Sequence, residues 1–228
     1  MAAHPADHPG PLVFVTDVDA PELAPADHHH LLRVLRLRPG SALTVGDGRG
    51  RWRPARFADV LEPTGPVEAV AAPTPALSVG FALVKGDKPE LVVQKLTELG
   101  IDRIVPFRAE RSVVRWDEAR AVKAVTRLRL VARSAAAQSH RPWLPVIDDV
   151  VDLGALIAEA GAGVAIADRG GAPVGPEHTT VLVGPEGGWG AGEVPVEAVR
   201  VALGPNVLRA ETAAITAGAL LVDRRGSE

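Results

Sequence analysis

Two passages near the end of the chain share one pattern, a short apolar run followed directly by Gly-Pro. The first, Val181–Trp189, reads VLVGPEGGW, and the second, Val201–Thr212, reads VALGPNVLRAET. Proline has no N–H to donate and its φ is fixed, so each buried strand must end here in a rigid turn. Bare glycine backbone at the carboxyl ends of neighbouring strands of an α/β sheet is a usual place for a ligand. The pattern predicts one pocket formed by both loops, with two ordinary connections as the alternative.

Strands and helices alternate from residue 77 onward, which predicts an α/β fold with a parallel sheet. The almost continuously apolar run Leu77–Val84 is typical of a strand covered on both faces. Asp87 and Glu90 can form a capping box at the start of a helix, and Gly100 is expected to end that helix. Further strands are expected at 104–107, 164–167, 181–183 and 199–203, and further helices at about 117–138, from Glu193 and after Arg209.

Residues 11 to about 72 contain only short apolar runs and turns, which predict a small β-rich domain. Strands are expected at 13–15, 42–45 and 52–60. Asp27 precedes a short helix that is expected to end at Pro39 and to carry Leu31, Leu32, Leu35 and Leu37 on its apolar side. Prolines cluster between residues 63 and 75, which places the domain boundary near residue 74 and divides the chain into 1–73 and 74–228.

The composition indicates a soluble cytoplasmic protein. The 228 residues suit one large domain or two smaller ones, and no apolar run approaches the length of a membrane span. The first ten residues lack the basic and then apolar pattern of a signal peptide. The chain has no cysteine, which excludes disulfides and thiolate metal sites.

Charge is distributed unevenly along the chain. The net charge of −3 argues against indiscriminate binding to nucleic acid. The segment from Lys85 to Arg141, however, holds thirteen Lys or Arg and seven Asp or Glu, so it carries +6 and the remainder carries −9. These cations can form a basic face for RNA, or they can be the solvated surface of a helix.

Several common chemistries find no support. Neither a P-loop pattern nor G-x-G-x-x-G occurs, so the glycine loops suit an adenosine-like group better than a polyphosphate. The run Asp27–His30 is not expected to bind a metal, because consecutive helical residues point about 100° apart. Ser139 and His140 are adjacent in sequence, which is no indication of a catalytic triad.

Five blocks, taken in order, resemble one known family. They are His29–Arg36, Lys85–Gly100, Gln138–Arg141 with Leu144-Pro145, VLVGPEGGWGAGE and LGPNVLRAETAAITA. Together they are similar to the RsmE-type 16S ribosomal RNA uridine-N3 methyltransferases of the SPOUT class, over nearly the whole chain. The resemblance implies an N-terminal PUA-like RNA-binding β-barrel, a trefoil-knotted domain with its knot at roughly 180–222, S-adenosylmethionine as the cofactor, and no metal. It also implies a homodimer whose site uses both chains, acting on 16S rRNA or the small ribosomal subunit.

The resemblance also assigns the residues of the site. Cofactor binding is expected at Asp168, Val183, Gly184, Pro185, Glu186, Gly187, Leu203, Gly204, Pro205 and Leu208. RNA binding is expected at Arg33, Arg36, Lys85, Arg111, Arg127, Arg133, Gln138 and Arg141. The sequence departs from the family pattern at Ala210, where Thr is usual, and at Ala137 and Ser134, where acidic residues are common.

The chemistry narrows the catalytic candidates to Arg141, Arg209 and Glu211. Methyl transfer from a sulfonium needs no covalent enzyme intermediate, but uridine N3 carries a proton that must be removed or whose loss must be stabilised. An arginine could stabilise the uridine anion, while Glu211 could accept the proton or, as we favour, cap a helix. N3 lies on the Watson–Crick edge, so the target base must be unpaired or flipped out.

Two alternative functions remain open from the sequence. The chain could be a SPOUT methyltransferase for another RNA position or for a ribose 2′-OH. It could also be a non-catalytic RNA-binding protein that retained the fold, although a binding module has no need of two intact glycine loops.

Overall fold

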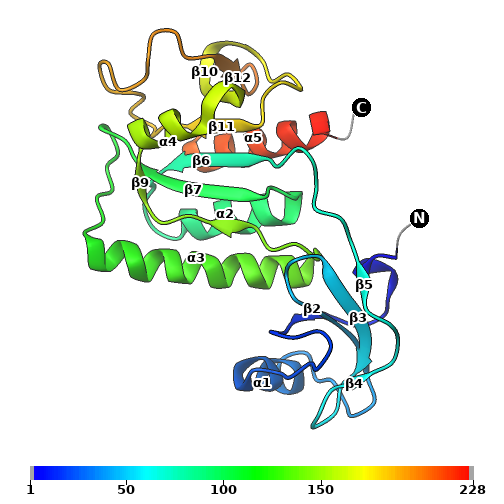
Figure 1. Cartoon of the computed structure of the whole chain (residues 1–228). Helices are drawn as coiled ribbons and strands as arrows, with labels where there is room; N and C mark the ends of the chain where they lie inside the picture. Colours follow the sequence, from blue (N-terminus) through cyan, green and yellow to red (C-terminus); the bar gives the residue numbers. More distant parts are fainter. Residues whose placement is uncertain (1–2, 226–228) are drawn as a thin grey trace. The chain divides into compact units, whose positions relative to one another are not determined.

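The computed structural model describes residues 3–225 and divides into two compact units (Figure 1). Unit 1 consists of Met1–Ala72 and Arg133–Leu144, and unit 2 consists of Pro73–Ala132 and Pro145–Glu228. No helix in the described part of the chain is long and apolar enough to cross a membrane.

Unit 1 is a small β-rich domain, as the sequence predicts. In its five-stranded sheet, β1 pairs parallel with β2, β2 pairs antiparallel with β3, and β3 also pairs with β4 and β5. Its elements are η1 (Pro5–Asp7), β1 (Leu12–Phe14), α1 (Pro25–Arg33), β2 (Ala42–Gly46), β3 (Arg51–Arg56), β4 (Glu62–Pro63) and β5 (Glu68–Ala69).

The segment Arg133–Leu144 belongs to unit 1 because of its packing and hydrogen bonds. Ala136 packs in a cluster with Leu12 and Phe14 of β1. The backbone N–H of Leu144 donates to the carbonyl of Gly48 at 2.9 Å, and the indole N–H of Trp143 donates to the carbonyl of Val70, also at 2.9 Å. These contacts join residues distant in sequence, which a pattern of local periodicity cannot anticipate.

The prediction for the helix around Asp27 is wrong in its bounds and in its apolar face. α1 begins at Pro25 and ends at Arg33, so Asp27 lies in its first turn. Leu31 is buried, but Leu32 and Leu35 are 41% and 45% exposed. Leu35 would share a face with Leu31 only if the helix continued, because residues four apart align on a helix and not beyond its end.

Unit 2 is built on a seven-stranded sheet in which all strands run parallel, and this confirms the predicted α/β fold. The strand order is β12-β10-β11-β6-β7-β8, and β9 also pairs with β7. The strands are β6 (Ser78–Ala82), β7 (Arg103–Arg108), β8 (Val146–Ile147), β9 (Val151–Asp152), β10 (Val164–Pro173), β11 (Thr180–Val183) and β12 (Arg200–Ala202). The helices are α2 (Lys88–Leu99), α3 (Glu118–Gln138), α4 (Leu153–Ala160) and α5 (Ala210–Arg225), with a short η2 (Gly161–Gly163).

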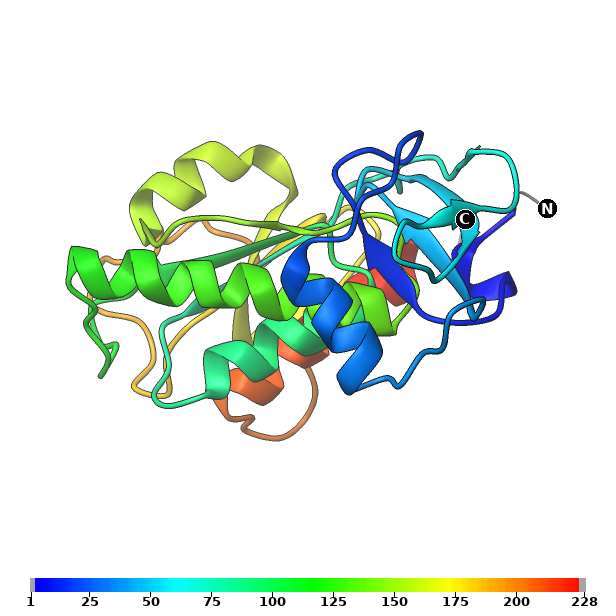
Figure 2. The same ribbon diagram turned by 90° about the horizontal axis from the view of Figure 1, so that it is seen from below.

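Helices cover both faces of this sheet (Figures 1 and 2). Alternate strand residues point to opposite faces, since side chains alternate along a strand. Val181 and Val183 pack in the cluster that includes α2, α3 and α5, whereas Leu182 packs in the cluster that includes α4. This arrangement explains the continuous apolar run around β6, because a strand covered twice needs apolar residues at every position.

Two local predictions in unit 2 are wrong. The side chain of Asp87 makes no capping hydrogen bond to α2, and Glu90 pairs with Arg127 at 3.3 Å in place of a capping box. No helix begins at Glu193. Its carboxylate accepts hydrogen bonds from the backbone N–H groups of Gly190, at 2.7 Å, and of Glu110, so it closes a loop. The predicted end of α2 is confirmed, since Gly100 adopts a left-handed conformation with φ of 100°.

Candidate active site

One cavity of unit 2 has a volume of about 500 Å³ and lies at the carboxyl ends of β11 and β12 and beside the middle of β10. The two glycine loops follow β11 and β12, which are not neighbours, because each of them pairs with β10. The predicted pocket between the loops is therefore present, but β10 supplies a third wall. Its size falls in the range of roughly 300–1,000 Å³ that is usual for small-molecule sites. Its lining comprises Ala167, Asp168, Arg169, Val183, Gly184, Pro185, Glu186, Gly188, Trp189, Arg200, Leu203, Gly204, Asn206, Val207, Leu208, Ala210 and Ala213.

A bulge in β10 brings polar side chains to this cavity. Ala167 and Ala172 both pair with Val201, so the residues between them leave the ladder. Asp168 and Arg169, which lie in the bulge, line the cavity. The carboxylate of Asp168 pairs with Arg200 at 2.6 Å, and both side chains are little more than one third exposed. The bulge thus places charges of both signs in the cavity wall.

The first glycine loop is shaped around a tryptophan. A Cβ on Gly184 would lie 2.8 Å from the ring of Trp189, so only glycine leaves room for this ring. Trp189 also stacks on Phe107, with ring centroids 6.1 Å apart and planes inclined by 11°. The backbone N–H of Gly188 donates to the carbonyl of Pro185 at 2.9 Å and tightens the turn. The loop is therefore a firm wall of the cavity.

The second loop presents bare backbone. Gly204 has φ of 147°, and a Cβ built there would meet nothing within 4 Å. A side chain at this position would extend into open space beside the cavity that Gly204 lines, from a backbone conformation that favours glycine. Leu203 and Leu208 give this side of the cavity an apolar surface, and Val207 is 74% exposed.

The predicted cofactor residues can now be placed. Those that line the cavity are Asp168, Val183, Gly184, Pro185, Glu186, Leu203, Gly204 and Leu208, while Gly187 and Pro205 do not. Sequence reasoning missed Trp189, Arg200 and Asn206. Trp189 is the last residue of the GPEGGW motif, so the sequence could have indicated it. Arg200 approaches the cavity only because β12 pairs with β10, which the sequence does not show.

Glu211 is held in an ion pair at the start of α5. Its side chain is 12% exposed and lies 3.1 Å from Nζ of Lys88, which stands 3.8 Å from the carboxylate of Glu186. Burial by itself would raise the pKa of Glu211. The hydrogen bond from its own backbone N–H, the hydrogen bond from Lys88 and the positive charges of Lys88 and Arg209 outweigh burial and lower this pKa from its ordinary value. A carboxylate with a lowered pKa is a weak proton acceptor, which favours the structural role of Glu211.

Arg209 lies between two residues of the cavity lining. Its neighbours Leu208 and Ala210 line the cavity, and the Arg209 side chain is exposed. It forms no ion pair with any residue that the structure describes, so its guanidinium is available to a ligand. Arg141, the other predicted catalytic arginine, is half-buried in unit 1.

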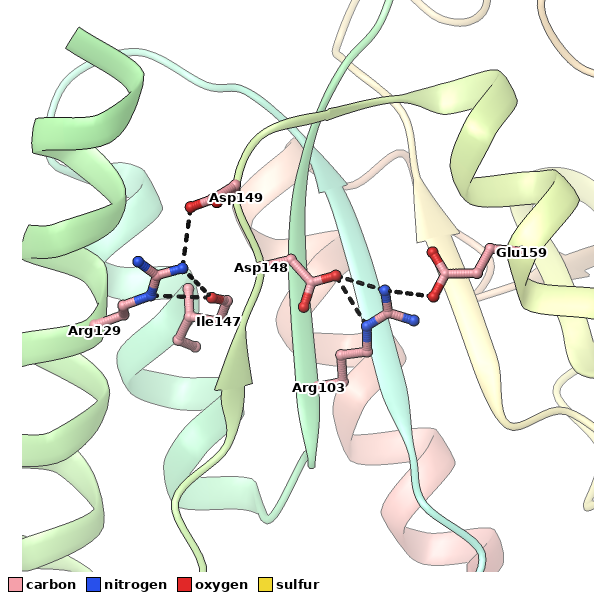
Figure 3. A network of polar contacts seen from close by, with 6 residues as sticks. All are labelled: Arg103, Arg129, Ile147, Asp148, Asp149 and Glu159. Atoms are coloured by element: carbon pink, nitrogen blue, oxygen red, sulfur yellow. Dashed lines mark hydrogen bonds and ion pairs between the residues drawn. The ribbon is translucent and has the colours of Figure 1, made fainter. Parts of the chain in front are cut away.

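Much of the positive charge between residues 85 and 141 is paired. Figure 3 shows that Arg103 faces Asp148 and Glu159, while Arg129 reaches the carbonyl of Ile147 and the carboxylate of Asp149. The hydrogen bond to Asp148 is the main reason that the pKa of Arg103 is raised. These two arginines therefore stabilise unit 2, and their charges are paired with carboxylates of the same unit.

The predicted RNA-binding residues divide into paired and exposed groups. Arg133 donates to both carboxylate oxygens of Asp27 at 2.9 Å and to the carbonyl of Phe14 at 2.7 Å, which is a structural role within unit 1. Arg127 pairs with Glu90, and Arg111 donates to the carbonyl of Gly187 at 3.3 Å. The remaining exposed residues of the set are Arg33, Arg36, Lys85 and Gln138. Within residues 3–225 no group of three or more His, Asp or Glu side chains could hold a metal ion.

Comparison with known proteins agrees with this architecture. The family model described as an RNA methyltransferase domain matches residues 72–222, and that of an RNA methyltransferase PUA domain matches residues 23–62. A ribosomal RNA small subunit methyltransferase E from Mycobacterium bovis is 36% identical over 214 residues, covering 82% of this chain and 80% of that protein. A protein of the same name from Synechocystis is 29% identical, covering 84% of this chain and 69% of that protein.

Solved structures of methyltransferases have the same fold as this chain. A methyltransferase from Legionella pneumophila, solved with bound SAM, is 28% identical with a TM-score of 0.82, over 92% of this chain and 96% of that one. A ribosomal RNA small subunit methyltransferase E from Neisseria gonorrhoeae, solved with S-adenosyl methionine, is 25% identical with a TM-score of 0.76, over 92% and 95% of the two chains. With its PUA-like domain, its methyltransferase domain built on a parallel sheet and its two glycine loops, this chain belongs to the ribosomal RNA small subunit methyltransferase E family.

Proposed function

We propose that this chain transfers the methyl group of S-adenosylmethionine to N3 of a uridine in 16S rRNA of the small ribosomal subunit. The observation that carries the proposal is the cavity at the two glycine loops, in a chain of the ribosomal RNA small subunit methyltransferase E family. Relatives from Legionella pneumophila and Neisseria gonorrhoeae were solved with this cofactor.

The cavity fits the cofactor chemically. Bare backbone at Gly204 can face a flat adenine, and Leu203 and Leu208 offer apolar contacts to it. The carboxylates of Asp168 and Glu186 line the cavity and can attract the cofactor's positive groups or bind its hydroxyls. When bound, the cofactor would supply an activated methyl group, whose transfer from the sulfonium releases a neutral thioether.

The chain's own part in the reaction is to orient the base and stabilise charge. Arg209, which is exposed beside the cavity lining, is suited to stabilise negative charge on uridine O2 or O4 as N3 loses its proton to water. Glu211 holds the start of α5 through Lys88. Arg141 is the second candidate for positioning the base.

The proposal extends to presentation and assembly. A reactive N3 requires an unpaired uridine, so unit 1 and the exposed cations are expected to hold single-stranded rRNA. The connection from β11 to β12 passes β10 in the sheet order, in keeping with a knot at roughly 180–222. We propose a homodimer, as the family resemblance implies, with the exposed Val207 of the cavity wall as a candidate contact. We also propose a cytoplasmic location. Sedimentation equilibrium would test the dimer, and a monomer at all concentrations would contradict it.

A methylation assay tests the proposed function. Purified chain, S-adenosylmethionine with a tritiated methyl group and small ribosomal subunits that lack the modification would be incubated, and the rRNA would be digested to nucleosides. We expect label in 3-methyluridine. Label in a ribose-methylated nucleoside would support the alternative of a 2′-OH methyltransferase, and no label in any rRNA nucleoside would support a binding protein without catalysis.

A further inference from the structure

A second cavity in unit 2, of about 230 Å³, lies outside the site described above. Residues near the start of α2 and in the first turns of α3 contribute to it, together with the segment that leads into α3. Its lining comprises Val84, Lys85, Gly86, Pro89, Glu90, Val114, Trp116, Arg120, Ala124, Arg127 and Leu128.

The second cavity combines apolar, aromatic and cationic side chains. Val84, Pro89 and Leu128 are buried and give it an apolar floor, and Trp116 is half-buried in its wall. Three cations, Lys85, Arg120 and Arg127, stand against the single carboxylate of Glu90, a net charge of +2. The pair between Arg127 and Glu90 spans 3.3 Å, with the two side chains 64% and 37% exposed. Such an exposed ion pair contributes little free energy, so a phosphate can compete with Glu90 for Arg127.

An aromatic ring beside an apolar floor with a cationic rim suits a nucleotide. Bases of single-stranded nucleic acid stack on aromatic side chains, while Lys and Arg hold the phosphates. The volume is below the roughly 300–1,000 Å³ of sites for whole small molecules, so one base with its phosphate is the appropriate size. The absence of a P-loop pattern from the sequence argues against a free nucleoside triphosphate.

Two contacts join the first glycine loop to residues that are close in sequence to the lining of the second cavity. Lys88, the neighbour of Pro89, reaches towards Glu186 of that loop. The segment that contains Trp116 begins near Arg111, whose guanidinium donates to the carbonyl of Gly187. A strand of RNA with one base at the first cavity therefore has a second binding place nearby.

We propose that the Trp116 cavity binds a nucleotide next to the target uridine in single-stranded rRNA. Trp116 stacks on the neighbouring base, and Lys85 and Arg120 contact its phosphate. This inference rests on the proposed function, because it assumes an rRNA substrate. It gives the enzyme a way to hold the strand beside its target without using the cofactor cavity.

Equilibrium binding of a single-stranded RNA oligonucleotide that contains a central uridine tests the inference, without cofactor present. Trp116→Ala is expected to weaken binding at least about fivefold, because stacking of one base contributes about 1–3 kcal/mol. Trp116→Phe should recover most of the affinity. Arg120→Glu should weaken binding and reduce the slope of log affinity against log salt by about one. Arg224→Glu, which exchanges an exposed arginine at the other end of the chain, is the matched control and should bind as wild type does.

The measurements separate this inference from the proposed function. Affinity for S-adenosylmethionine should be unchanged in all four variants. If wild type methylates rRNA while Trp116→Ala and Arg120→Glu bind RNA as tightly as wild type and with the same salt slope, the nucleotide subsite is wrong. Loss of cofactor affinity in Trp116→Ala would also overturn it, since Trp116 would then support the first cavity. If wild type binds RNA through Trp116 but methylates none, the proposed function fails and the subsite stands.

Discussion

The role of Glu211 depends on its immediate neighbours. The carboxylate is nearly buried and paired with Lys88, and its backbone position opens α5. We expect Glu211→Gln to lower the free energy of unfolding by roughly 1–2 kcal/mol at neutral pH, because a charge-assisted hydrogen bond is lost. Urea denaturation would measure the change, and the methylation rate should fall little. A large loss of rate without loss of stability would make Glu211 the proton acceptor.

The lowered pKa of Glu211 gives this effect a definite dependence on pH. A group with a depressed folded-state pKa stabilises the fold above its unfolded pKa and loses that contribution as pH falls through the folded value. The ordinary pKa is 4.5. The difference in stability between wild type and Glu211→Gln should therefore be full above roughly pH 5 and shrink at more acidic pH. A difference that grows on acidification would contradict the assignment of this ion pair.

Arg209 is the residue expected to act on the substrate. Arg209→Ala should lower the single-turnover methylation rate by roughly 100-fold, because the stabilised charge develops mainly in the transition state. Affinities for cofactor and RNA should change little. Arg224→Ala, at the far end of α5, provides the control. A wild-type rate in Arg209→Ala would move the role to Arg141 or to a partner subunit.

At the scale of elements, the glycine loops differ in what a side chain would disturb. Gly184→Val would strike the ring of Trp189, so its effect combines packing and binding. Gly204→Val is the cleaner test, since its side chain enters open space beside the cavity. We expect it to weaken S-adenosylmethionine binding at least about tenfold, measured by calorimetry. Gly192→Val is matched to it, because Gly192 also has positive φ and open space but lies outside the cavity lining. An equal loss of S-adenosylmethionine affinity in Gly204→Val and Gly192→Val would show that backbone strain, and not a blocked cavity, causes the effect.

Near the C-terminal end of α3, Arg133 makes its polar contacts within unit 1. Arg133 joins Asp27 through two hydrogen bonds and also stands 5.8 Å from the ring centre of Phe14. Arg133→Ala should cost about 2–3 kcal/mol of stability, since it leaves a half-buried carboxylate unpaired. A double-mutant cycle with Asp27→Ala, followed by urea denaturation, would measure the coupling. No coupling, together with weaker RNA binding, would restore Arg133 as an RNA-binding residue.

The sequence pattern predicted most elements, but not where they end or which elements they pair with. The strands of unit 2 follow from apolar runs that a doubly covered sheet requires, and Gly100 marks the end of α2 because glycine adopts the left-handed conformation most readily. Glu193 was misplaced in a helix because its hydrogen-bond partner Glu110 lies 83 residues away. The bulge that brings Asp168 to Arg200 likewise depends on strand pairing, which no local spacing encodes.

At the scale of the whole molecule, the chain combines a small β-rich unit with a sheet domain that contains the cavity at the two glycine loops. The sequence motifs indicated the two glycine loops. The structure adds the cavity wall formed by β10, the ring of Trp189 in the lining, and the ion pair between Lys88 and Glu211. The division of labour that we propose is RNA presentation by unit 1 together with the exposed cations, and methyl transfer by unit 2.

Nucleoside mass spectrometry of 16S rRNA tests whether this chain forms 3-methyluridine there. The rRNA would come from cells with the gene, from cells without it, and from deleted cells carrying either wild type or Gly204→Val. We expect that 3-methyluridine disappears on deletion, returns with wild type and stays absent with Gly204→Val. An unchanged amount of 3-methyluridine in 16S rRNA after deletion would contradict it.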